Sequence, residues 1–276
     1  MEPRRVKPLD VVVVSCITFE TVKVVSPIVH LRADRVYLLH YSEAEERGGK
    51  DVYSAFYEEV VDQLKTLMQL DDESIKEVNV KVFRFKEVLT ALLEILQRER
   101  DQGNIVYVNV SAGSMEYAAA ATLASMMVAG VKPVAVGVET YLIPNERIME
   151  VYFENGHPVG LAKSVYEPTE LPTYPIDMPP ADLVQALRIL RTKLESKLIT
   201  SYPNMIKALK ETKAWTYEGL NVDEKITQAE KMFYSRHYIE SWLNRGWVEK
   251  EKGKRGKMKL TIAGENVCDI FHLEQP

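Results

Sequence analysis

The stretch N-V-S-A-G-S-M-E-Y-A-A-A-A, residues 109–121, decides the fold class because it joins a β-rich run to a helical one. The apolar run I-V-Y-V, residues 105–108, precedes it, and a row of alanines ends it. Small and polar residues between a strand and a helix make a tight turn. Gly113 also allows a ligand to approach the backbone, and the free N–H groups that begin a helix favour an anion such as phosphate. Two interpretations are open: a structural turn and a phosphate-binding turn.

The same alternation of β-rich and helical runs fills the first half of the chain. We expect strands at residues 10–16, 34–40, 78–83, 104–110 and 134–138. Helices are expected between them, at residues 20–31, 51–70, 86–100 and 115–129, where apolar residues recur at helical spacing. Repeated strand–helix–strand units form a parallel sheet with helices on both faces. The predicted fold class is α/β, with a Rossmann-like parallel sheet.

The pattern changes after Gly137. Residues 139–143 and 148–153 are two β-rich runs around P-N-E-R, which predicts a terminal β-hairpin at the sheet edge. Residues 158–180 follow with six prolines, too many for a helix or a central strand. We therefore expect a Rossmann-like ligand-binding domain at residues 1–157, a proline-rich linker at 158–180 and a second domain at 181–276.

The second domain has the layout of a winged helix-turn-helix. Helices are expected at residues 181–194, 202–212 and 223–245, then strands at 247–250 and 257–261 around a basic turn, and a last helix at 263–271. Its charge differs from that of the rest of the chain: residues 1–180 hold 18 Lys and Arg against 27 Asp and Glu, whereas residues 181–276 hold 17 against 13. An excess of positive charge suits a polyanionic partner.

Duplex DNA is the partner that this layout favours, because a helix that reads the groove and a wing that grips phosphates would lie side by side. The candidate DNA-binding residues are Lys231, Tyr234, Ser235, Arg236 and His237 on the third helix, and Lys252, Lys254, Arg255 and Lys257 in the wing. The alternative is a winged helix used for dimerisation, in which Trp242 and Trp247 are simply core residues.

The first domain has its own candidate ligand site. In a parallel sheet, ligands lie outside the carboxyl ends of the strands. The candidate ligand-binding residues at that edge are Ser15, Cys16, Ile17, Thr18, Phe19, His40, Arg84, Lys86, Asn109, Ser111, Ala112, Gly113, Ser114, Met115, Gly137 and Glu139. Hydroxyls, aromatic rings and helix N-termini suit a nucleotide. The chain has neither the GxGxxG fingerprint nor the GxxxxGK[ST] loop, which disfavours NAD enzymes and P-loop NTPases.

Several other classes of protein are disfavoured by composition and motifs. The apolar share of 46% and charged share of 27% are those of a soluble globular protein. Long apolar runs and a signal-peptide core are missing, so we expect a cytoplasmic protein without membrane contact. Cys16 and Cys268 match no metal-ligand spacing, and we expect buried, reduced thiols. The five histidines are scattered, without HExxH or GxSxG, so we predict no metal, cofactor or catalytic residue.

A strand that ends in Asn109, Ser111, Gly113 and Ser114, in a Rossmann-like domain joined to a C-terminal winged helix, resembles the largely archaeal CARF (CRISPR-associated Rossmann fold) regulators. Their usual pattern after this strand is N-[VI]-[ST]-x-G-[TS]-[KR]. The resemblance in layout covers nearly the whole chain. Met115 stands where a basic residue is common.

The resemblance implies a homodimer that binds a cyclic oligoadenylate across its two-fold axis and reads DNA in response, as a transcription regulator. Residues 15–19 would then complete the nucleotide site. Met115 removes a charge-assisted phosphate contact of about 1.5 to 3 kcal/mol, which favours sensing over cleavage of the ligand. Two alternatives stay open: a ring nuclease that degrades the cyclic oligoadenylate, and a protein-interaction adaptor.

Overall fold

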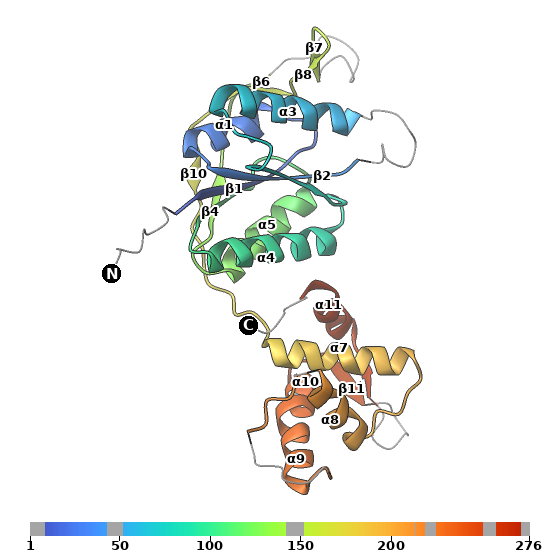
Figure 1. Cartoon of the computed structure of the whole chain (residues 1–276). Coiled ribbons are helices and arrows are strands. Elements are labelled where there is room, and N and C mark those ends of the chain that lie inside the picture. The colour runs from blue at the N-terminus through green and yellow to red at the C-terminus, as the bar shows by residue number, and fades with distance from the viewer. Residues whose placement is uncertain are drawn as a thin grey trace, which may run out of the picture. The chain divides into compact units, whose positions relative to one another are not determined.

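The computed structural model describes residues 9–42, 52–141, 152–212, 214–218, 225–250 and 258–271. The chain divides into two compact units, Met1–Asp177 and Met178–Pro276 (Figure 1). Each unit has its own core and is described separately below.

A six-stranded sheet in the order β10-β5-β4-β1-β2-β3 is the centre of the first unit. Five strands run parallel: β1 (Val11–Cys16), β2 (Arg35–His40), β3 (Ile75–Asn79), β4 (Ile105–Asn109) and β5 (Lys132–Ala135). The short β10 (Thr169–Glu170) pairs with β5 in the antiparallel direction. The α/β class and the mostly parallel sheet predicted from the sequence are confirmed.

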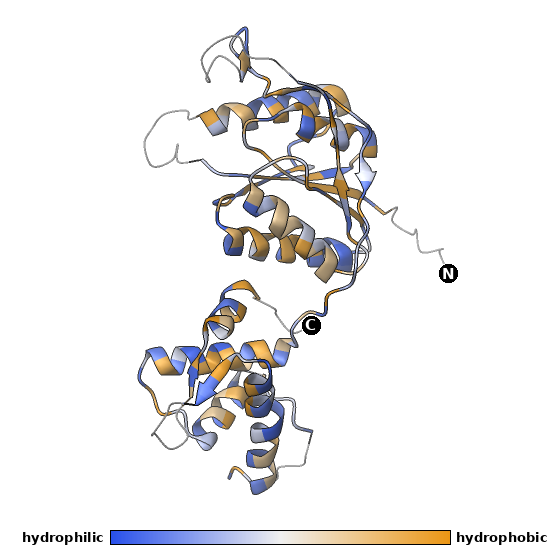
Figure 2. Cartoon of the chain, turned by 180° about the vertical axis from the view of Figure 1, so that it is seen from behind, coloured by the Kyte–Doolittle hydropathy of each residue, from blue (hydrophilic) through white to orange (hydrophobic). Residues whose placement is uncertain are grey.

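Two pairs of helices cover the two faces of this sheet. Helices α1 (Val22–Leu31) and α3 (Val52–Met68) lie on one face, and α4 (Phe85–Asp101) and α5 (Met115–Met127) lie on the other (Figure 1). The middle strands are buried on both sides, with Val13 of β1 and Leu38 of β2 fully inaccessible to solvent. Figure 2 shows hydrophobic and hydrophilic positions alternating around the helices, as expected for helices that pack one face on a sheet.

The third strand differs from its predicted position. It was expected at residues 78–83, but β3 spans Ile75–Asn79 and pairs with β2 from Val36↔Ile75 to His40↔Asn79. The apolar residues that suggested a later strand belong to the loop before α4. Val82 is buried there, whereas the side chain of Phe83 is 48% exposed. Apolar character alone therefore misplaced the strand.

The terminal hairpin was predicted with the wrong partner strand. Strand β6 (Val138–Tyr141) pairs with β9 (Ala162–Val165) instead of the run at 148–153. Residues 142–151 lie outside the described residues, and the short β7 (Phe153–Glu154) pairs with β8 (His157–Pro158). The stretch expected to be a linker thus supplies β9 and β10. Its prolines permit this because both pairings are short and β10 lies at an edge of the sheet.

The second unit is a small helical unit with a two-stranded ribbon. Its elements are α7 (Ala181–Glu195), α8 (Tyr202–Glu211), α9 (Gln228–Phe233), the π-helical segment η1 (Tyr234–Glu240), α10 (Ser241–Asn244), β11 (Val248–Lys250), β12 (Met258–Leu260) and α11 (Ile262–Ile270). Strands β11 and β12 are antiparallel. Fully buried Trp242 lies in the core, where its indole N–H donates to the Leu183 carbonyl at 3.1 Å.

The third helix begins at a capping box. The Thr227 hydroxyl accepts from the Glu230 amide at 3.2 Å, and the Glu230 carboxylate accepts from the Thr227 amide at 2.7 Å. The helix then continues through α9, η1 and α10 without a break. It was expected from residue 223, and residues 219–224 lie outside the described residues.

A buried carboxylate ties α4 to the amino-terminal end of the sheet. Glu99 of α4 is 1% exposed and accepts from Arg35 at 2.8 Å, from the Tyr37 hydroxyl at 2.5 Å and from the Asn104 amide at 2.7 Å. Burial alone would raise the pKa of Glu99, but the hydrogen bonds from Tyr37 and Asn104 and the charge of Arg35 together lower it. Glu99 is therefore ionised and fully paired in the folded protein.

Replacing this carboxylate should destabilise the protein in a pH-dependent way. We expect Glu99→Gln to lower the free energy of unfolding by about 2 kcal/mol near neutral pH. Because folding lowers the pKa of Glu99, its contribution is complete above about pH 4.3, the value of an unfolded glutamate, and is lost as the pH falls through the folded value. Urea titrations over a pH series would measure this difference.

The matched control is Glu94→Gln, an exposed carboxylate on the same helix, which should change stability little at any pH. A stability difference for Glu99→Gln that stays constant from neutral to acid pH would contradict the assignment of an ionised Glu99.

Candidate functional site

The order of the strands fixes one crevice at the carboxyl edge of the sheet. Strands β1 and β4 are neighbours, but β1 leads into α1 on one face and β4 leads into α5 on the other (Figure 1). The two connections diverge, and ligands of open α/β sheets bind at such a switch point. The candidate site therefore lies between the loop after β1 and the loop after β4.

The side chain of Asn109 holds these two loops together. It is fully buried at the end of β4, and its amide nitrogen donates to the Ser15 hydroxyl at 3.0 Å and to the Lys23 carbonyl at 2.8 Å. Its amide oxygen accepts from the Ser111 backbone amide at 3.0 Å. Both the nitrogen and the oxygen of the amide are hydrogen-bonded within the protein. Asn109 and the buried Ser15 therefore support the site and do not face solvent.

Two serines fix the turn between β4 and α5 in the same way. The Ser114 hydroxyl caps α5 by accepting from the Tyr117 amide at 3.0 Å, and it donates to the Val82 carbonyl at 2.6 Å. The Ser111 hydroxyl accepts from the Val136 amide at 2.5 Å. The turn is thereby tied to the loop after β3 and to the end of β5. Ser111 keeps its own O–H hydrogen for a further acceptor.

Close packing explains the glycine in this turn. Gly113 has a φ of +100°, and a Cβ built on it would lie 2.7 Å from the Cys16 Cβ and 2.9 Å from a ring carbon of Tyr117. Cys16 is fully buried, and burial raises the pKa of its thiol. Ile17 and Ala112 are buried beside it. Glycine is required here by the protein itself, whether or not a ligand is bound.

His40 is also a packing residue. It is 2% exposed, its Nε2 lies 2.7 Å from a carboxylate oxygen of Glu77, and its ring stacks on Tyr57 with centroids 4.3 Å apart. The phenol of Tyr57 is itself half-buried, and burial raises its pKa to about 12. These contacts hold the His40 ring in the core, while its buried Nδ1 has no hydrogen-bond partner among the described residues.

Cationic, aromatic and apolar side chains face solvent where α4 and α5 begin, together with the exposed carboxylate of Glu87. The Met115 side chain is 85% exposed at the start of α5, and Arg84 and Lys86 are exposed at the start of α4. Within the described part of the chain, no carboxylate pairs with Arg84. Phe83 and Phe85, exposed by 48% and 36%, flank Arg84; Phe83 was missed from the sequence, and Phe85 lies in the predicted rim loop but not among the candidate ligand-binding residues. The alternation F-R-F after an apolar run was the available signal.

The remaining predicted ligand-binding residues contact other parts of the first unit. Phe19 is half-buried in an aromatic cluster, with ring centroids 4.8 Å from Tyr53 and 5.4 Å from Tyr152, and Thr18 precedes it, also half-buried. Gly137 and Glu139 are exposed at the other end of the site. The Gly137 carbonyl accepts from the Tyr166 amide at 2.9 Å, and the Glu139 carboxylate accepts from the Ser164 hydroxyl at 3.0 Å.

A later segment covers the start of α1. The Thr21 hydroxyl donates to the Val159 carbonyl at 2.9 Å, and the Ala162 amide donates to the Glu20 carboxylate at 3.2 Å. Gly160 allows this contact, because a Cβ on it would lie 2.6 Å from the Phe19 carbonyl oxygen. The N-terminus of α1 is therefore closed by protein, whereas that of α5 faces solvent through Met115.

The predicted DNA-binding residues of the third helix fall into two groups. Tyr234 is fully buried, and burial raises the pKa of its phenol, so it is a core residue. The His237 Nε2 lies 2.5 Å from a carboxylate oxygen of Asp182, and its ring stacks on Phe233. Arg236 is exposed, and Lys231 and Ser235 are half-buried. The wing residues Lys252, Lys254, Arg255 and Lys257 lie outside the described residues.

Three general features of the described residues bear on function. No group of three or more His, Cys, Asp or Glu side chains in them is placed to hold a metal ion. None of the helices found in these ranges is both long and apolar enough to cross a bilayer. Cys16 and Cys268 are free thiols, both buried.

Comparison with known proteins gives one family match and several distant structures. Residues 11–146 match the family described as HFX_2341_N:-like, N-terminal. A search of curated proteins found no match.

Three solved structures resemble the chain at 12% sequence identity each. Can2 from Sulfobacillus thermosulfidooxidans in complex with cyclic tetra-adenylate has a TM-score of 0.36, covering 94% of this chain and 63% of that one. Enterococcus italicus Csm6 bound to cyclic hexa-2'-fluoro-hexa-dAMP has a TM-score of 0.40, with coverages of 87% and 59%. Protein VC1899 from Vibrio cholerae has a TM-score of 0.36, with coverages of 93% and 63%. This chain thus spans about three fifths of the length of these structures.

The packing of Gly113 can be tested against a glycine with a similar backbone. We expect Gly113→Ala to destabilise the protein by about 2 kcal/mol more than Gly130→Ala, as measured by thermal or urea unfolding. Gly130 has a φ of +85° and open space around it, so its substitution carries only the backbone cost. Equal losses for the two variants would show that the contact with Cys16 does not restrict residue 113.

Proposed function

We propose that the chain is a ligand-gated, DNA-binding transcription regulator whose first unit binds a cyclic oligoadenylate as a homodimer. The observation that carries the proposal is the switch point between β1 and β4, where Asn109 fixes both loops. A ligand site must hold its shape before the ligand arrives, and a buried, fully bonded amide provides that rigidity. The turn at residues 109–114 also carries the resemblance to the CARF family.

The solvent-facing groups of the site suit a nucleotide. The amide groups at the start of α5 and the free O–H of Ser111 can donate to a phosphate. Arg84 is a cation on the loop that Ser114 ties to the same turn. Phe83 and Phe85 offer ring faces for adenine bases. In this arrangement, phosphate is held by the turn and by Arg84, and bases lie against the aromatic residues.

The site favours binding over cleavage. Cleavage of a cyclic oligoadenylate needs a ribose 2'-hydroxyl to attack the adjacent phosphate in line, helped by positive charge on the phosphate oxygens. Met115 is uncharged and exposed where a cation would give that help. Groups that bind the ground state and the transition state equally well increase the affinity for the ligand but do not increase the rate of its cleavage. We therefore propose a sensor, and ring cleavage is the competing activity to test.

The outer face of α5 suits a second copy of the chain. From Met115 to Met127 the only charged residue of this helix is Glu116. Met115 and Ala119 are exposed, and Leu123, Met126 and Met127 are only half-buried. A helix that is apolar on most sides is normally covered on most sides. A two-fold contact along α5 would provide the cover and would place two ligand sites near one axis.

The second unit has the elements needed to bind a duplex. Residues 251–257 follow β11 and precede β12 in the sequence, lie outside the described residues, and carry four of the proposed phosphate contacts. The third helix presents Arg236, which is exposed and has no ionic partner among the described residues. Because Tyr234 is buried and His237 contacts Asp182, base contacts from this helix are assigned to Arg236 and its neighbours Lys231 and Ser235.

Ligand binding can be tested by calorimetry with cyclic tetra-adenylate and cyclic hexa-adenylate. We expect one ring to bind per two chains, and Arg84→Ala to weaken binding about tenfold through loss of a charge-assisted contact. Met115→Lys should strengthen binding by a similar factor. Chromatography of labelled rings incubated with excess protein should show no linear products.

The control is Lys76→Ala, which removes an exposed cation from β3 and should leave the affinity unchanged. One ring per single chain would argue against the dimer. If the wild-type protein converts the rings to linear products within minutes and Arg84→Ala does not, the chain is a ring nuclease and the sensor proposal is wrong.

DNA binding can be tested with a random duplex pool over a salt series. Lys254→Ala combined with Arg255→Ala should weaken binding to all sequences alike and reduce the slope of log K against log[salt] by about 2. Arg236→Ala should instead change which sequences are selected. Lys207→Ala, an exposed lysine on α8, is the control and should alter neither. Wild-type affinity for the double variant at every salt concentration would exclude the wing as a phosphate contact.

A further inference from the structure

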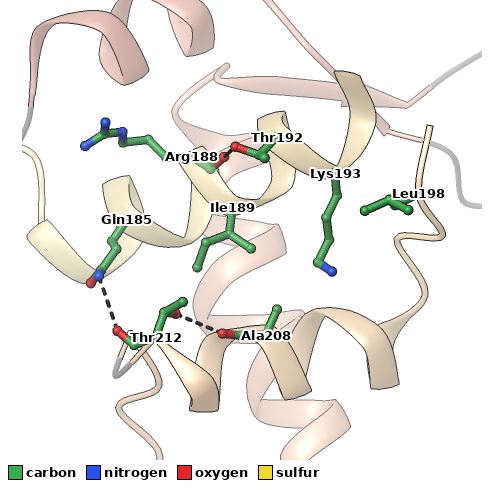
Figure 3. A pocket seen from close by; sticks show the side chains of 8 residues that line it. All are labelled: Gln185, Arg188, Ile189, Thr192, Lys193, Leu198, Ala208 and Thr212. Carbon is green, nitrogen blue, oxygen red and sulfur yellow. Dashed lines mark hydrogen bonds between the residues drawn. The ribbon is translucent and has the colours of Figure 1, made fainter. Parts of the chain in front are cut away.

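The second unit contains a groove that the proposed function does not use. It lies between α7 and α8, has a volume of about 440 Å³, and is bordered at one end by Leu198 from the connection between the two helices (Figure 3). Gln185, Ile189 and Lys193 point from α7 toward α8 and follow one another at intervals of four residues. Eight residues of helix span about 12 Å, so the groove is about two turns long.

The chemistry of the groove changes along its length. Ile189 and Ala208 make an apolar middle, and Leu198 lies at the end near Lys193. At the other end, the Gln185 amide nitrogen donates to the Thr212 carbonyl at 3.4 Å. The Gln185 amide oxygen is buried and has no donor among the described residues. A buried acceptor without a donor costs free energy, which rotation of the amide toward an N–H group of an occupant would recover.

The charge of the groove indicates the charge of its occupant. Arg188 and Lys193 are both in its lining, which includes no aspartate or glutamate. Within the described ranges, no carboxylate pairs with Lys193, whereas the nearby Lys207 has Glu211 as its partner on α8. A carboxylate on the occupant would complement Lys193 without displacing an existing ion pair.

The rim of the groove favours a peptide over a small molecule. Leu198 is 57% exposed, and the adjacent Ile199 is 72% exposed. An amphipathic helix laid along the two turns of the groove would cover Leu198 together with Ile189 and Ala208.

We propose that this groove docks a short acidic amphipathic helix from a partner protein. Its apolar side chains lie against Ile189, Ala208 and Leu198, and a carboxylate pairs with Lys193. An N–H group of the helix N-terminus or of a polar side chain donates to Gln185. The groove shares no residue with the proposed nucleotide site or with the proposed DNA contacts, and it gives the second unit a protein partner.

The test uses the full chain and a fluorescein-labelled helical peptide of about 16 residues, four turns long, with leucines on one face and glutamates beside them. Fluorescence anisotropy should show saturable binding. Lys193→Glu and Leu198→Asp should each weaken it about tenfold or more, through charge repulsion and loss of apolar contact. Both side chains lie at the surface of the groove, and circular dichroism would verify that the variants are folded.

Two controls separate the groove from general charge attraction. Lys207→Glu reverses an exposed charge on α8 outside the groove and should leave the affinity within about twofold. A peptide with lysines in place of the glutamates should bind about tenfold more weakly. The wild-type, Lys193→Glu and Lys207→Glu proteins are also titrated with duplex DNA and compared by sedimentation velocity.

Several outcomes would overturn the proposal. They are equal binding of the two peptides, unchanged affinity in Lys193→Glu, or no saturable binding up to about 1 mM, a concentration that corresponds to about 4 kcal/mol. A loss of DNA affinity in Lys193→Glu, with peptide binding unchanged, would make the groove a nucleic-acid contact. A change of oligomeric state in Lys193→Glu, again without an effect on the peptide, would make it a contact between copies of the chain.

Discussion

The hydrogen bonds of one buried amide, Asn109, hold the first unit's site in shape. The amide joins the end of β4 to Ser15 of β1 and to the first turn of α1, and it orients the turn that leads to α5. A smaller apolar side chain here would remove the bond to the buried Ser15 hydroxyl, at about 1 to 3 kcal/mol, and the bonds to two part-buried backbone groups, at less each. These bonds link the two loops at the switch point, and we expect the loops to move as one unit.

This constraint also decides which groups remain for a ligand. The hydroxyls of Ser15 and Ser114, the amide of Asn109 and the thiol of Cys16 are buried or bonded within the protein. The proposed ligand would therefore meet a second layer that includes helix amides, Arg84, exposed aromatic rings and Met115. In the folded chain, the polar side chains of the motif bond mainly to one another and to neighbouring segments.

The parts of the fold that follow from local periodicity were predictable. Strands β1, β2 and β4, helices α1, α3, α4 and α5, and the order of elements in the second unit follow from patterns that each segment carries in itself. The carboxyl edge follows as the candidate site from the predicted parallel sheet, but the surroundings of its residues depend on contacts between distant segments. Asn109 contacts residues 86 and 94 positions away, and Thr21 contacts Val159 across 138 positions. Nothing in a single segment specifies such partners, and for the same reason the pairing of β6 with β9 was missed.

The position of β9 and β10 decides where the first unit can be separated from the second. A fragment cut at residue 157 would retain all five parallel strands but lose the segment that closes α1 and the strand that pairs with Val134 and Ala135. Edge β5 would then present free backbone N–H and C=O groups beside an apolar core, which is the geometry from which sheets aggregate. A fragment that extends through residue 177 keeps that edge paired.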